Sequence, residues 1–211
     1  MNIIFNGPPS SGKDEGCEFL SAIYGFKHLS FKSQLFKDTI EYFGVDEEWF
    51  MEGYNRLTKD SPEYELQGLS RRNALIYVSE DVKKPKYGLS YYGDKTVEKL
   101  NGIDSYCFSD GGFKDEVMPV INKLGTDNIC IIQIFRDNCS YSNDSRDYLN
   151  GDLQEEFVLG GKKSFKNNVG KPVLPVRSYQ IHNNGSVKDF HKTIRTIYRR
   201  ELDVCKKSDI S

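Results

Sequence analysis

The fold is decided by the stretch Ile3-Ile4-Phe5-Asn6-Gly7-Pro8-Pro9-Ser10-Ser11-Gly12-Lys13-Asp14. Its apolar start, 3–5, predicts a short buried strand. The residues that follow match the pattern G-x-x-x-x-G-K, and a helical pattern begins directly after the lysine. This order of strand, glycine-rich loop and helix is typical of a phosphate-binding loop, so the sequence predicts a nucleotide-binding protein. The alternative is an accidental strand, turn and helix that happens to contain Gly-Lys.

Each residue type in this loop has a physical purpose. Glycines allow the backbone to fold so that successive N–H groups point at phosphate oxygens. The new helix adds the positive end of its dipole, and Lys13 can reach the outer phosphates of a nucleotide. Asp14 departs from the motif, because Ser or Thr normally stands there and supplies a hydroxyl to Mg²⁺. The predicted phosphate-binding residues are Gly7, Ser10, Ser11, Gly12, Lys13 and Asp14.

Length and composition favour one α/β domain. A chain of 211 residues can bury a sizeable core, and 37% hydrophobic and 28% charged residues are ordinary for a soluble protein. The formal net charge of -2 shows no nucleic-acid signature. No signal peptide and no membrane-spanning run is expected, so the predicted location is the cytoplasm. The five cysteines form no C-x-x-C pair, which favours buried reduced thiols, and the three histidines lack metal-ligand spacing.

Alternating strand and helix patterns predict a parallel sheet. Apolar runs predict five strands, at 3–5, 26–31, 104–108, 129–135 and 173–182. Helical spacing predicts helices from the loop to residue 24 and at 33–43, 47–51, 69–82, 91–100, about 117–124, and 187–198. Ser33 is the predicted cap of the second helix, and Pro85 and Gly88 are expected in a loop. Residues 205–211 are expected to form a polar tail.

Several charged residues fall where a ligand would bind. Asp110 follows the third strand, and α/β sheets bind ligands at the carboxyl ends of their strands. Arg71 and Arg72 lie in the first turn of a helix, where they oppose the helix dipole, and this placement suggests that they meet an anion. Two solvated arginines are an equally good interpretation of that stretch alone. Arg136 ends the fourth strand, and the polar segment after it, which contains Arg146, can bury little apolar surface and is predicted to form a mobile lid.

The order of these features resembles nucleoside monophosphate kinases, and more closely the phage deoxynucleoside monophosphate kinases. In the phage family the loop often reads Ser-Gly-Lys-Asp, as Ser11-Gly12-Lys13-Asp14 does here. Glu15 departs from that family, which often has Thr at this position. The other similar motifs are Leu29-Ser-Phe31, Leu35-Phe-Lys37, Ser70-Arg-Arg-Asn-Ala-Leu-Ile76, Ser79-Glu-Asp-Val-Lys-Lys-Pro85, Tyr91-Tyr-Gly93, Ser109-Asp-Gly-Gly-Phe113 and Asn143-Asp-Ser-Arg146.

The resemblance implies an α/β, three-layer P-loop kinase fold in a single domain, residues 1–211. A central parallel sheet of about five strands would be flanked by helices, with a helical substrate-binding insertion at about 46–102 and the mobile lid at about 137–170. The resemblance also implies transfer of a phosphoryl group from ATP to a deoxynucleoside monophosphate, with Mg²⁺ as cofactor, for phage DNA synthesis in the host cytoplasm. Such transfer depends on positioning and charge neutralisation, because the acceptor phosphate is already an anionic nucleophile.

On this interpretation the donor side of the site comes from the first and last thirds of the chain. Lys13 and the backbone of 10–14 would bind the donor phosphates. Asp14 and Asp110 would hold Mg²⁺, directly or through water. The turn Asn183-Asn184-Gly185, at the end of the last strand, would lie behind the adenine of the donor.

The predicted arginines would bind the acceptor phosphate and the phosphoryl group that is transferred. Arginine forks suit phosphate oxygens, so Arg71 and Arg72 are candidates for the acceptor phosphate. Arg136 and Arg146 would close over the transferring group and add positive charge where water has been excluded. The predicted catalytic residues are Lys13, Arg71, Arg72, Arg136 and Arg146.

Two other functions stay open at this stage. One is a related P-loop kinase that acts on a modified pyrimidine within DNA, although a DNA-binding tract normally needs clustered Lys and Arg, which this chain lacks. The other is a nucleotide-binding regulatory protein without turnover, in which Asp14 and Glu15 are signs of lost catalysis. No pattern in the sequence identifies the base of the acceptor or the oligomeric state.

Overall fold

The computed structural model describes residues 1–142, 146–157, 163–164 and 173–208. Its centre is a seven-stranded sheet in the order β2-β3-β1-β4-β7-β5-β6. From β2 to β5 along this order all neighbours are parallel, and β6 runs antiparallel to β5. This confirms the predicted α/β class with a central parallel sheet. The strands are β1 (Asn2–Asn6), β2 (Lys27–Leu29), β3 (Tyr106–Phe108), β4 (Ile129–Phe135), β5 (Asn150–Phe157), β6 (Lys163–Ser164) and β7 (Val173–His182).

β5 is a strand that the sequence does not predict. The lid was expected at about 137–170, but Asn150–Phe157 pairs with β7 and belongs to the sheet, so the lid prediction is wrong for these residues. A strand near the sheet edge is ordered by backbone hydrogen bonds to its neighbour, and therefore it lacks the apolar run expected of a central strand. Residues 143–145, 158–162 and 165–170 of the expected lid lie outside the described residues.

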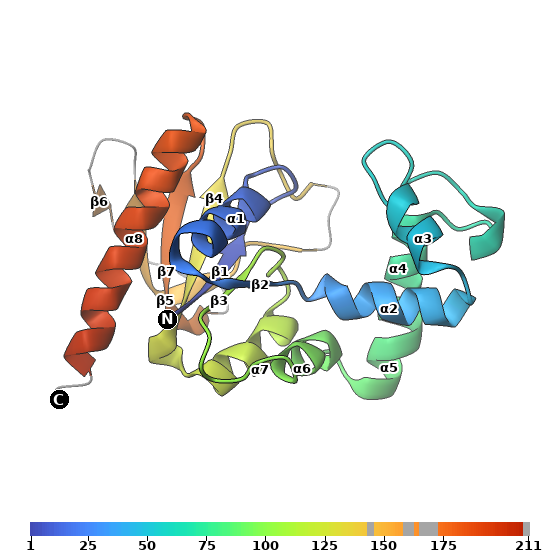
Figure 1. Ribbon diagram of the computed structural model, residues 1–211, viewed down its shortest axis with the longest axis horizontal. Helices are drawn as coiled ribbons and strands as arrows, with labels where there is room; N and C mark the ends of the chain where they lie inside the picture. Colours follow the sequence, from blue (N-terminus) through green and yellow to red (C-terminus); the bar gives the residue numbers. More distant parts are fainter. Residues whose placement is uncertain (143–145, 158–162, 165–172, 209–211) are drawn as a thin grey trace.

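Helices cover both faces of the sheet (Figure 1). α1 (Lys13–Tyr24) and α8 (Val187–Ser208) lie on one face, and α6 (Tyr91–Val97) and α7 (Lys114–Leu124) lie on the other. Successive residues of a strand point to opposite faces. Ile3 accordingly packs in the cluster that includes α1 and α8, whereas Ile4 packs in the cluster that includes α7. The two buried clusters produce the predicted three layers of helix, sheet and helix.

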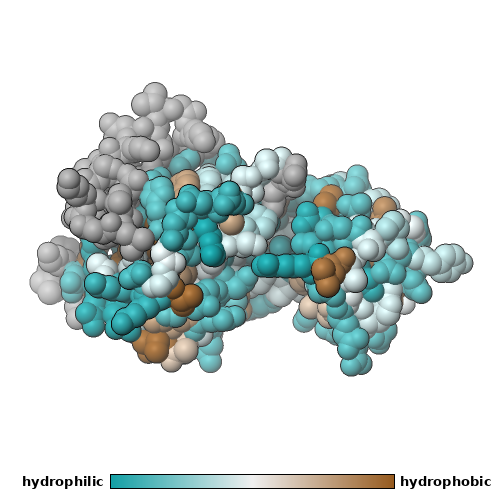
Figure 2. All heavy atoms as spheres, turned by 90° about the horizontal axis from the view of Figure 1, so that it is seen from above, coloured by the Kyte–Doolittle hydropathy of each residue, from teal (hydrophilic) through white to brown (hydrophobic). Residues whose placement is uncertain are grey.

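Between β2 and β3 the chain leaves the sheet and forms a helical lobe, on the right of Figure 1. The lobe has its own buried cluster, centred on Phe50, Leu66, Ala74 and Leu75. Figure 2 shows a narrower waist between this lobe and the body that carries the sheet. The lobe contains α2 (Lys32–Phe43), α3 (Glu47–Gly53), the 3₁₀ helix η1 (Tyr64–Leu66), α4 (Arg71–Tyr77), the π-helical turn η2 (Val78–Lys83) and α5 (Lys84–Tyr87). A further 3₁₀ helix, η3 (Thr126–Asn128), precedes β4.

Three predicted boundaries are wrong. Helical structure that begins at Arg71 continues through Pro85 to Tyr87, where a loop was expected. Proline lacks an N–H and clashes with a regular α-helical turn, and the wider π-helical turn directly before Pro85 accommodates that defect. Ser33 lies inside α2 rather than at its cap. α8 continues to Ser208, so residues 205–208 belong to a helix and not to a polar tail.

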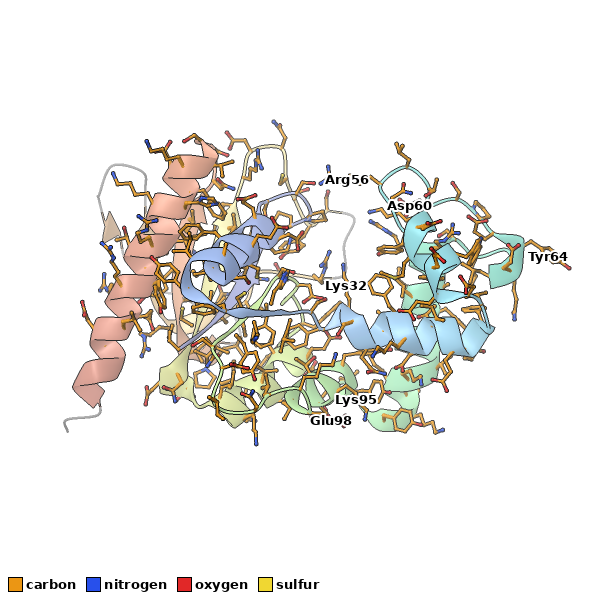
Figure 3. All side chains as sticks on the ribbon, viewed as in Figure 1. Lys32, Arg56, Asp60, Tyr64, Lys95 and Glu98 are labelled. Carbon is orange, nitrogen blue, oxygen red and sulfur yellow. The ribbon has the colours of Figure 1, made fainter. Side chains whose placement is uncertain are left out.

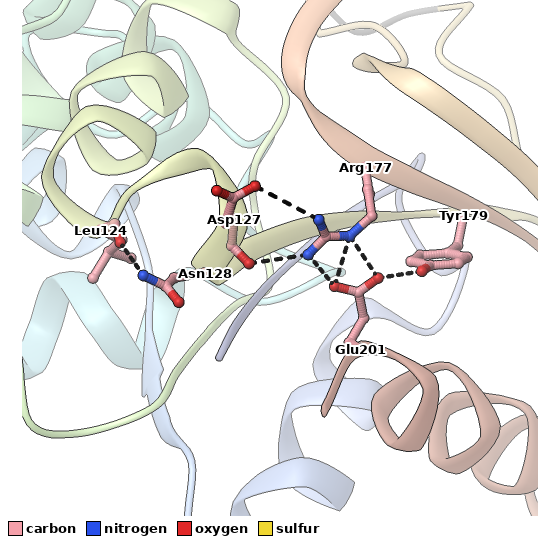
Figure 4. Close-up of polar contacts among 6 residues, drawn as sticks. All are labelled: Leu124, Asp127, Asn128, Arg177, Tyr179 and Glu201. Carbon is pink, nitrogen blue, oxygen red and sulfur yellow. Dashed lines mark hydrogen bonds and ion pairs between the residues drawn. The ribbon is translucent and has the colours of Figure 1, made fainter. Parts of the chain in front are cut away.

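A buried ion pair fastens α8 to the sheet (Figure 4). Arg177 of β7 donates to the carboxylate of fully buried Glu201 from Nε at 2.9 Å and from Nη2 at 2.7 Å. Tyr179 donates its hydroxyl to the same carboxylate, and Arg177 also donates to the Asp127 carbonyl at 3.0 Å. A buried charge requires such a full set of partners. Because Arg177 pairs with the amino-terminal half of β4, this pair serves the fold and lies away from the carboxyl edge of the sheet.

Candidate active site

The loop between β1 and α1 has a backbone that few residue types can adopt. Gly12 has φ +112° and Ser10 has φ +65°, both in the region that disfavours side chains with a Cβ. A Cβ on Gly7 would lie 2.7 Å from the carbonyl oxygen of Ile134, so this position also requires glycine. No side chain of the described residues caps the N-terminus of α1. Because the first N–H groups of a helix lack partners within it, the loop offers these donors to an anion.

Lys13 is the first residue of α1 and is largely buried, with 8% of its surface exposed. Its Nζ donates to the Pro8 carbonyl at 2.8 Å, across the loop. Burial, together with the positive charges of Arg146 and Lys32, lowers the pKa of Lys13 to about 8, although two nearby carboxylates oppose the shift. An anion with several negative charges would raise the pKa of Lys13 again, because it would attract Lys13, Arg146 and Lys32 together.

Residues at the ends of β4 and β7 hold the loop in place. Asn183, directly after β7, donates its side-chain N–H to the Ser11 carbonyl at 2.8 Å. Arg136, directly after β4, donates from Nη1 to the Ser10 carbonyl at 3.2 Å. Asn183 therefore supports the phosphate loop, a contact that differs from the predicted place behind an adenine, and Arg136 contacts the loop on its exposed side. Asn184 and Gly185, the other two residues of the predicted turn, are exposed.

Asp110, directly after β3, has a structural task at the same edge of the sheet. Its carboxylate accepts the Ser30 hydroxyl at 2.6 Å and the backbone N–H groups of Phe31 and Lys32 at 3.0 Å each. It thereby caps the N-terminus of α2, the task that the sequence assigned to a serine of the helix itself. Asp14 is exposed in the first turn of α1. The described part of the chain contains no group of three or more metal-binding side chains, so a metal role for the two carboxylates stays a prediction.

Asn6 is a site residue that sequence reasoning missed. It is the last residue of β1, fully buried, and its side chain bonds to two separate segments. Its Nδ2 donates to the carbonyls of Gly111 at 2.7 Å and Asp147 at 3.1 Å, and its Oδ1 accepts the Leu149 N–H at 2.8 Å. Asn6 thus places the segment that begins with Arg146 beside the phosphate loop. A buried polar residue directly before the first loop glycine is the sequence signal that could have identified it.

A cavity of about 410 Å³ opens between the carboxyl edge of the sheet and the helical lobe. Two of the predicted arginines, Arg72 and Arg146, line it. Arg146 also lies over Gly112, where an added Cβ would be 2.7 Å from the arginine Cδ. Lys32, at the start of α2 between the two lobes (Figure 3), is a cation of the cavity wall that sequence reasoning missed. Apolar members of the wall include Phe31, Leu35, Leu75 and Phe113.

Arg71 is outside the cavity wall, so its position does not support the predicted role in acceptor binding. It is 4% exposed, its guanidinium pairs with Glu63, and it lies over the ring of Trp49 at 4.2 Å from the centroid. Arg72, in contrast, has a side chain that is 39% exposed and pairs with Asp60 at 3.1 Å. The geometry therefore keeps Arg72 as a candidate for the acceptor phosphate and gives Arg71 the task of fastening α4 to α3.

A group of charges at the cavity wall consists of exposed Glu80 and buried Glu116, which line the cavity, and buried Lys84 beside them. Lys84 Nζ lies 2.7 Å from Glu80 Oε1, 3.5 Å from Glu116 Oε1 and 4.6 Å from the centroid of the Phe113 ring. Glu116 is 7% exposed, and burial raises the pKa of its carboxyl to about 7, although Lys84 opposes the shift. Sequence reasoning missed this group because its members come from η2, α5 and α7, which only folding brings together.

Comparisons with known proteins do not identify a family for this chain, so its function must be argued from the geometry of the site. No family model and no curated protein matches the chain. Among solved structures, one described as "a putative kinase from Chloroflexus aurantiacus" is similar, with a TM-score of 0.35 and 15% sequence identity. The match covers 64% of this chain and 59% of that one, so the chain spans less than two thirds of that structure. None of the helices in the described ranges has the length and apolar content to cross a bilayer.

Proposed function

We propose that this protein is a kinase that transfers the γ-phosphoryl group of ATP to a deoxynucleoside monophosphate and so produces ADP and the diphosphate. One observation carries the proposal: Arg146 lines the cavity of about 410 Å³ and also lies close enough to Lys13 to lower its pKa. The phosphate loop suits the donor, and the cavity has a volume usual for a small ligand. A donor and an acceptor bound in these two places would meet at one cluster of cations.

The proposed chemistry depends on charge neutralisation and positioning. An oxygen of the acceptor phosphate attacks the γ-phosphorus while the bond to the leaving ADP oxygen breaks, and the acceptor needs no general base because it is already charged. Lys13 and Arg146 would stabilise the charge on the transferring group, and Lys32 and Arg72 would bind the acceptor phosphate. Asn6 would act as a positioning residue, because it holds the segment that carries Arg146.

The residues present fit Mg²⁺ as a cofactor of the donor. Asp14 and Asp110 both lie near enough to Lys13 to raise its pKa, and thus near the place for the donor phosphates. Mg²⁺ keeps several waters and takes few protein ligands when phosphates supply the others. Since the Asp110 carboxylate already accepts three hydrogen bonds, it would hold the ion through water, and exposed Asp14 could bind it directly. The ion would neutralise part of the phosphate charge.

The test is ADP release by the purified protein with Mg²⁺ and ATP. The acceptors would be the four deoxynucleoside monophosphates in turn, a duplex that contains a modified pyrimidine, and none. We expect ADP release that requires a monophosphate. Release that requires the duplex would favour the kinase acting on DNA, and ATP binding without release under any condition would favour the regulatory protein.

A further inference from the structure

We propose that Glu116 recognises the base of the acceptor and selects a base with two adjacent N–H donors, which among the four DNA bases is guanine. The inference rests on the proposed function, because it names the substrate of the same cavity. It concerns the part of the cavity wall where Glu116 of α7 lies beside Lys84 of α5.

The cavity wall carries cations and carboxylates from different elements. Among the cations, Arg146 and Lys32 lie near the phosphate loop, since both lower the pKa of Lys13. From there the wall passes to Phe113, which directly follows the glycine beneath Arg146. Lys84 lies over the Phe113 ring at 4.6 Å and pairs with Glu116 at 3.5 Å. A nucleotide that binds Arg146 and Lys32 through its phosphate and lies along Phe113 would bring its base to Glu116.

The apolar part of the wall suits the faces of a flat ring. Phe31, Leu35, Leu75 and Phe113 are apolar and line the cavity. Phe31 is held in place by stacking on Phe108, with the ring centroids 5.6 Å apart. Stacking on aromatic side chains tolerates every base, because every base has a π face. Selection among bases must therefore come from polar groups that meet the edge of the ring.

Glu116 has the burial and the unused bonding capacity for this task. It is 7% exposed, and within the described part of the chain Lys84 is the one side chain that pairs with it. Lys84 lies closer to Glu80, at 2.7 Å, so the Glu116 carboxylate retains acceptor positions. α6 and α7 pack closely at this position, since a Cβ added to Gly93 of α6 would lie 2.2 Å from the Glu116 carbonyl oxygen. This close packing fixes the position of the Glu116 backbone. A buried carboxylate of this kind favours N–H donors from a ligand.

The four bases differ in what they offer to a carboxylate. An ionised carboxylate accepts two parallel N–H bonds, and guanine offers such a pair at N1–H and N2–H₂. Adenine and cytosine offer an amino donor beside a ring nitrogen that accepts, which suits a protonated carboxyl or an amide. Thymine has one N–H between two carbonyl oxygens, and these oxygens repel a carboxylate. Guanine is thus the best partner of an ionised Glu116.

The protonation of Glu116 makes this preference depend on pH. Burial raises the pKa of its carboxyl to about 7, the negative charges of Asp110 and Glu80 also raise it, and Lys84 lowers it. Tyr92 of α6 is the other titratable group that acts with this cluster, and burial raises its own pKa, so it stays neutral. Guanine binding should strengthen as the pH rises from about 6 to 8 and Glu116 ionises. Binding of an adenine or cytosine nucleotide should weaken over the same interval.

The test compares KM for the four deoxynucleoside monophosphates at pH 6, 7 and 8 with saturating Mg²⁺ and ATP. In the wild type we expect deoxyguanosine monophosphate to have the lowest KM, with a decrease of up to about tenfold from pH 6 to pH 8. Glu116→Gln should raise that KM about tenfold and remove its pH dependence, because one bidentate contact is lost. The same variant should lower KM for the adenine or cytosine nucleotide, whose edges match an amide, and leave KM for ATP unchanged.

The matched control is Glu98→Gln, since Glu98 is exposed after α6, pairs with Lys95 and lies outside the cavity wall (Figure 3). It should behave as the wild type at every pH. An unchanged guanine-nucleotide KM in Glu116→Gln, or a wild type that prefers another base, would overturn the inference and leave the proposed function standing. Absence of turnover with every monophosphate would overturn the proposed function instead. If Glu116→Gln does not fold, the wild-type ranking and its pH dependence decide the matter.

Discussion

The phosphate loop and the acceptor cavity are built in opposite ways. The loop is one continuous stretch, 7–14, whose backbone conformation depends on glycines at fixed positions and whose donors are backbone N–H groups and Lys13. The cavity takes side chains from α2, α4, η2, α6 and α7 and from the loops after β3 and before β5. One site thus follows from local backbone geometry, and the other follows from the packing of elements that are distant in the sequence.

This difference separates their expected contributions to catalysis. Under the proposed function the loop would hold the part of the donor that is the same in every turnover, so substitutions in it should reduce activity with all acceptors. The cavity would hold the part of the acceptor that varies, so substitutions in it should change KM for the acceptor and leave KM for the donor unchanged. Arg146 lines the cavity and also lowers the pKa of Lys13, so its loss should show both effects.

The largest effect is expected from Lys13→Ala. Removal of a group that stabilises developing phosphoryl charge should lower kcat by about 10²- to 10³-fold or more with every acceptor. The fold should survive, because the change removes a cation whose burial is itself unfavourable. Steady-state kinetics and a thermal melt measure the two quantities, and Lys123→Ala, in the last turn of α7, is the control. Near-normal turnover by folded Lys13→Ala would show that the loop is not the donor site.

Arg146→Ala should have the next largest effect. Arg146 lines the cavity and acts electrostatically on Lys13, so we expect kcat to fall by about 10-fold to 10²-fold as transition-state stabilisation is lost. Rapid-quench measurement of the transfer step would show whether the chemical step itself slows. A variant with normal kcat and a higher KM for the monophosphate alone would place Arg146 in the acceptor region only.

The neighbouring arginines Arg71 and Arg72 should behave differently from one another. Arg72→Ala should raise KM for the monophosphate about tenfold, with KM for ATP and the stability unchanged. Arg71→Ala should lower the free energy of unfolding by about 2 kcal/mol, because it breaks a largely buried pair with Glu63 and the contact with Trp49. Urea denaturation and acceptor titrations distinguish the two. Destabilisation by Arg72→Ala together with a KM effect of Arg71→Ala would reverse these assignments.

The smallest effect is a pH dependence of ATP binding. The pKa of Lys13 is lowered to about 8 in the free protein, so the side chain is charged below pH 8 and loses its proton above it. Donor phosphates favour the charged form, and KM for ATP should therefore rise above pH 8, by at most about tenfold per pH unit. Burial of the charged form also costs stability below pH 8, a cost that disappears as the pH rises toward the usual lysine value. A flat ATP KM from pH 7 to 9 would contradict the electrostatic coupling at the loop.

Sequence patterns predicted the parts of the fold that depend on local preferences. The strand, loop and helix at the phosphate site were placed correctly because Gly7 and Gly12 stand where the backbone admits little else. The alternation of strands and helices predicted the parallel sheet, and the family resemblance implied the three layers that the structure shows. β5 was missed because its order depends on pairing with β7, and the continuation of the helix through Pro85 was missed because a π-helical turn compensates for the proline.

The sequence by itself determined the phosphate loop and the class of fold, because glycine conformations and apolar periodicity act over a few neighbouring residues. Tertiary structure decided the roles of several charges that lie far from this loop in the sequence. It placed Asp110 at the cap of α2, turned Arg71 into a packing residue, and brought Lys32 and Glu116 into one cavity wall. Charged groups interact through space over several ångströms. The number of residues between two charges in the sequence does not indicate how far apart they lie after the helices and strands have packed.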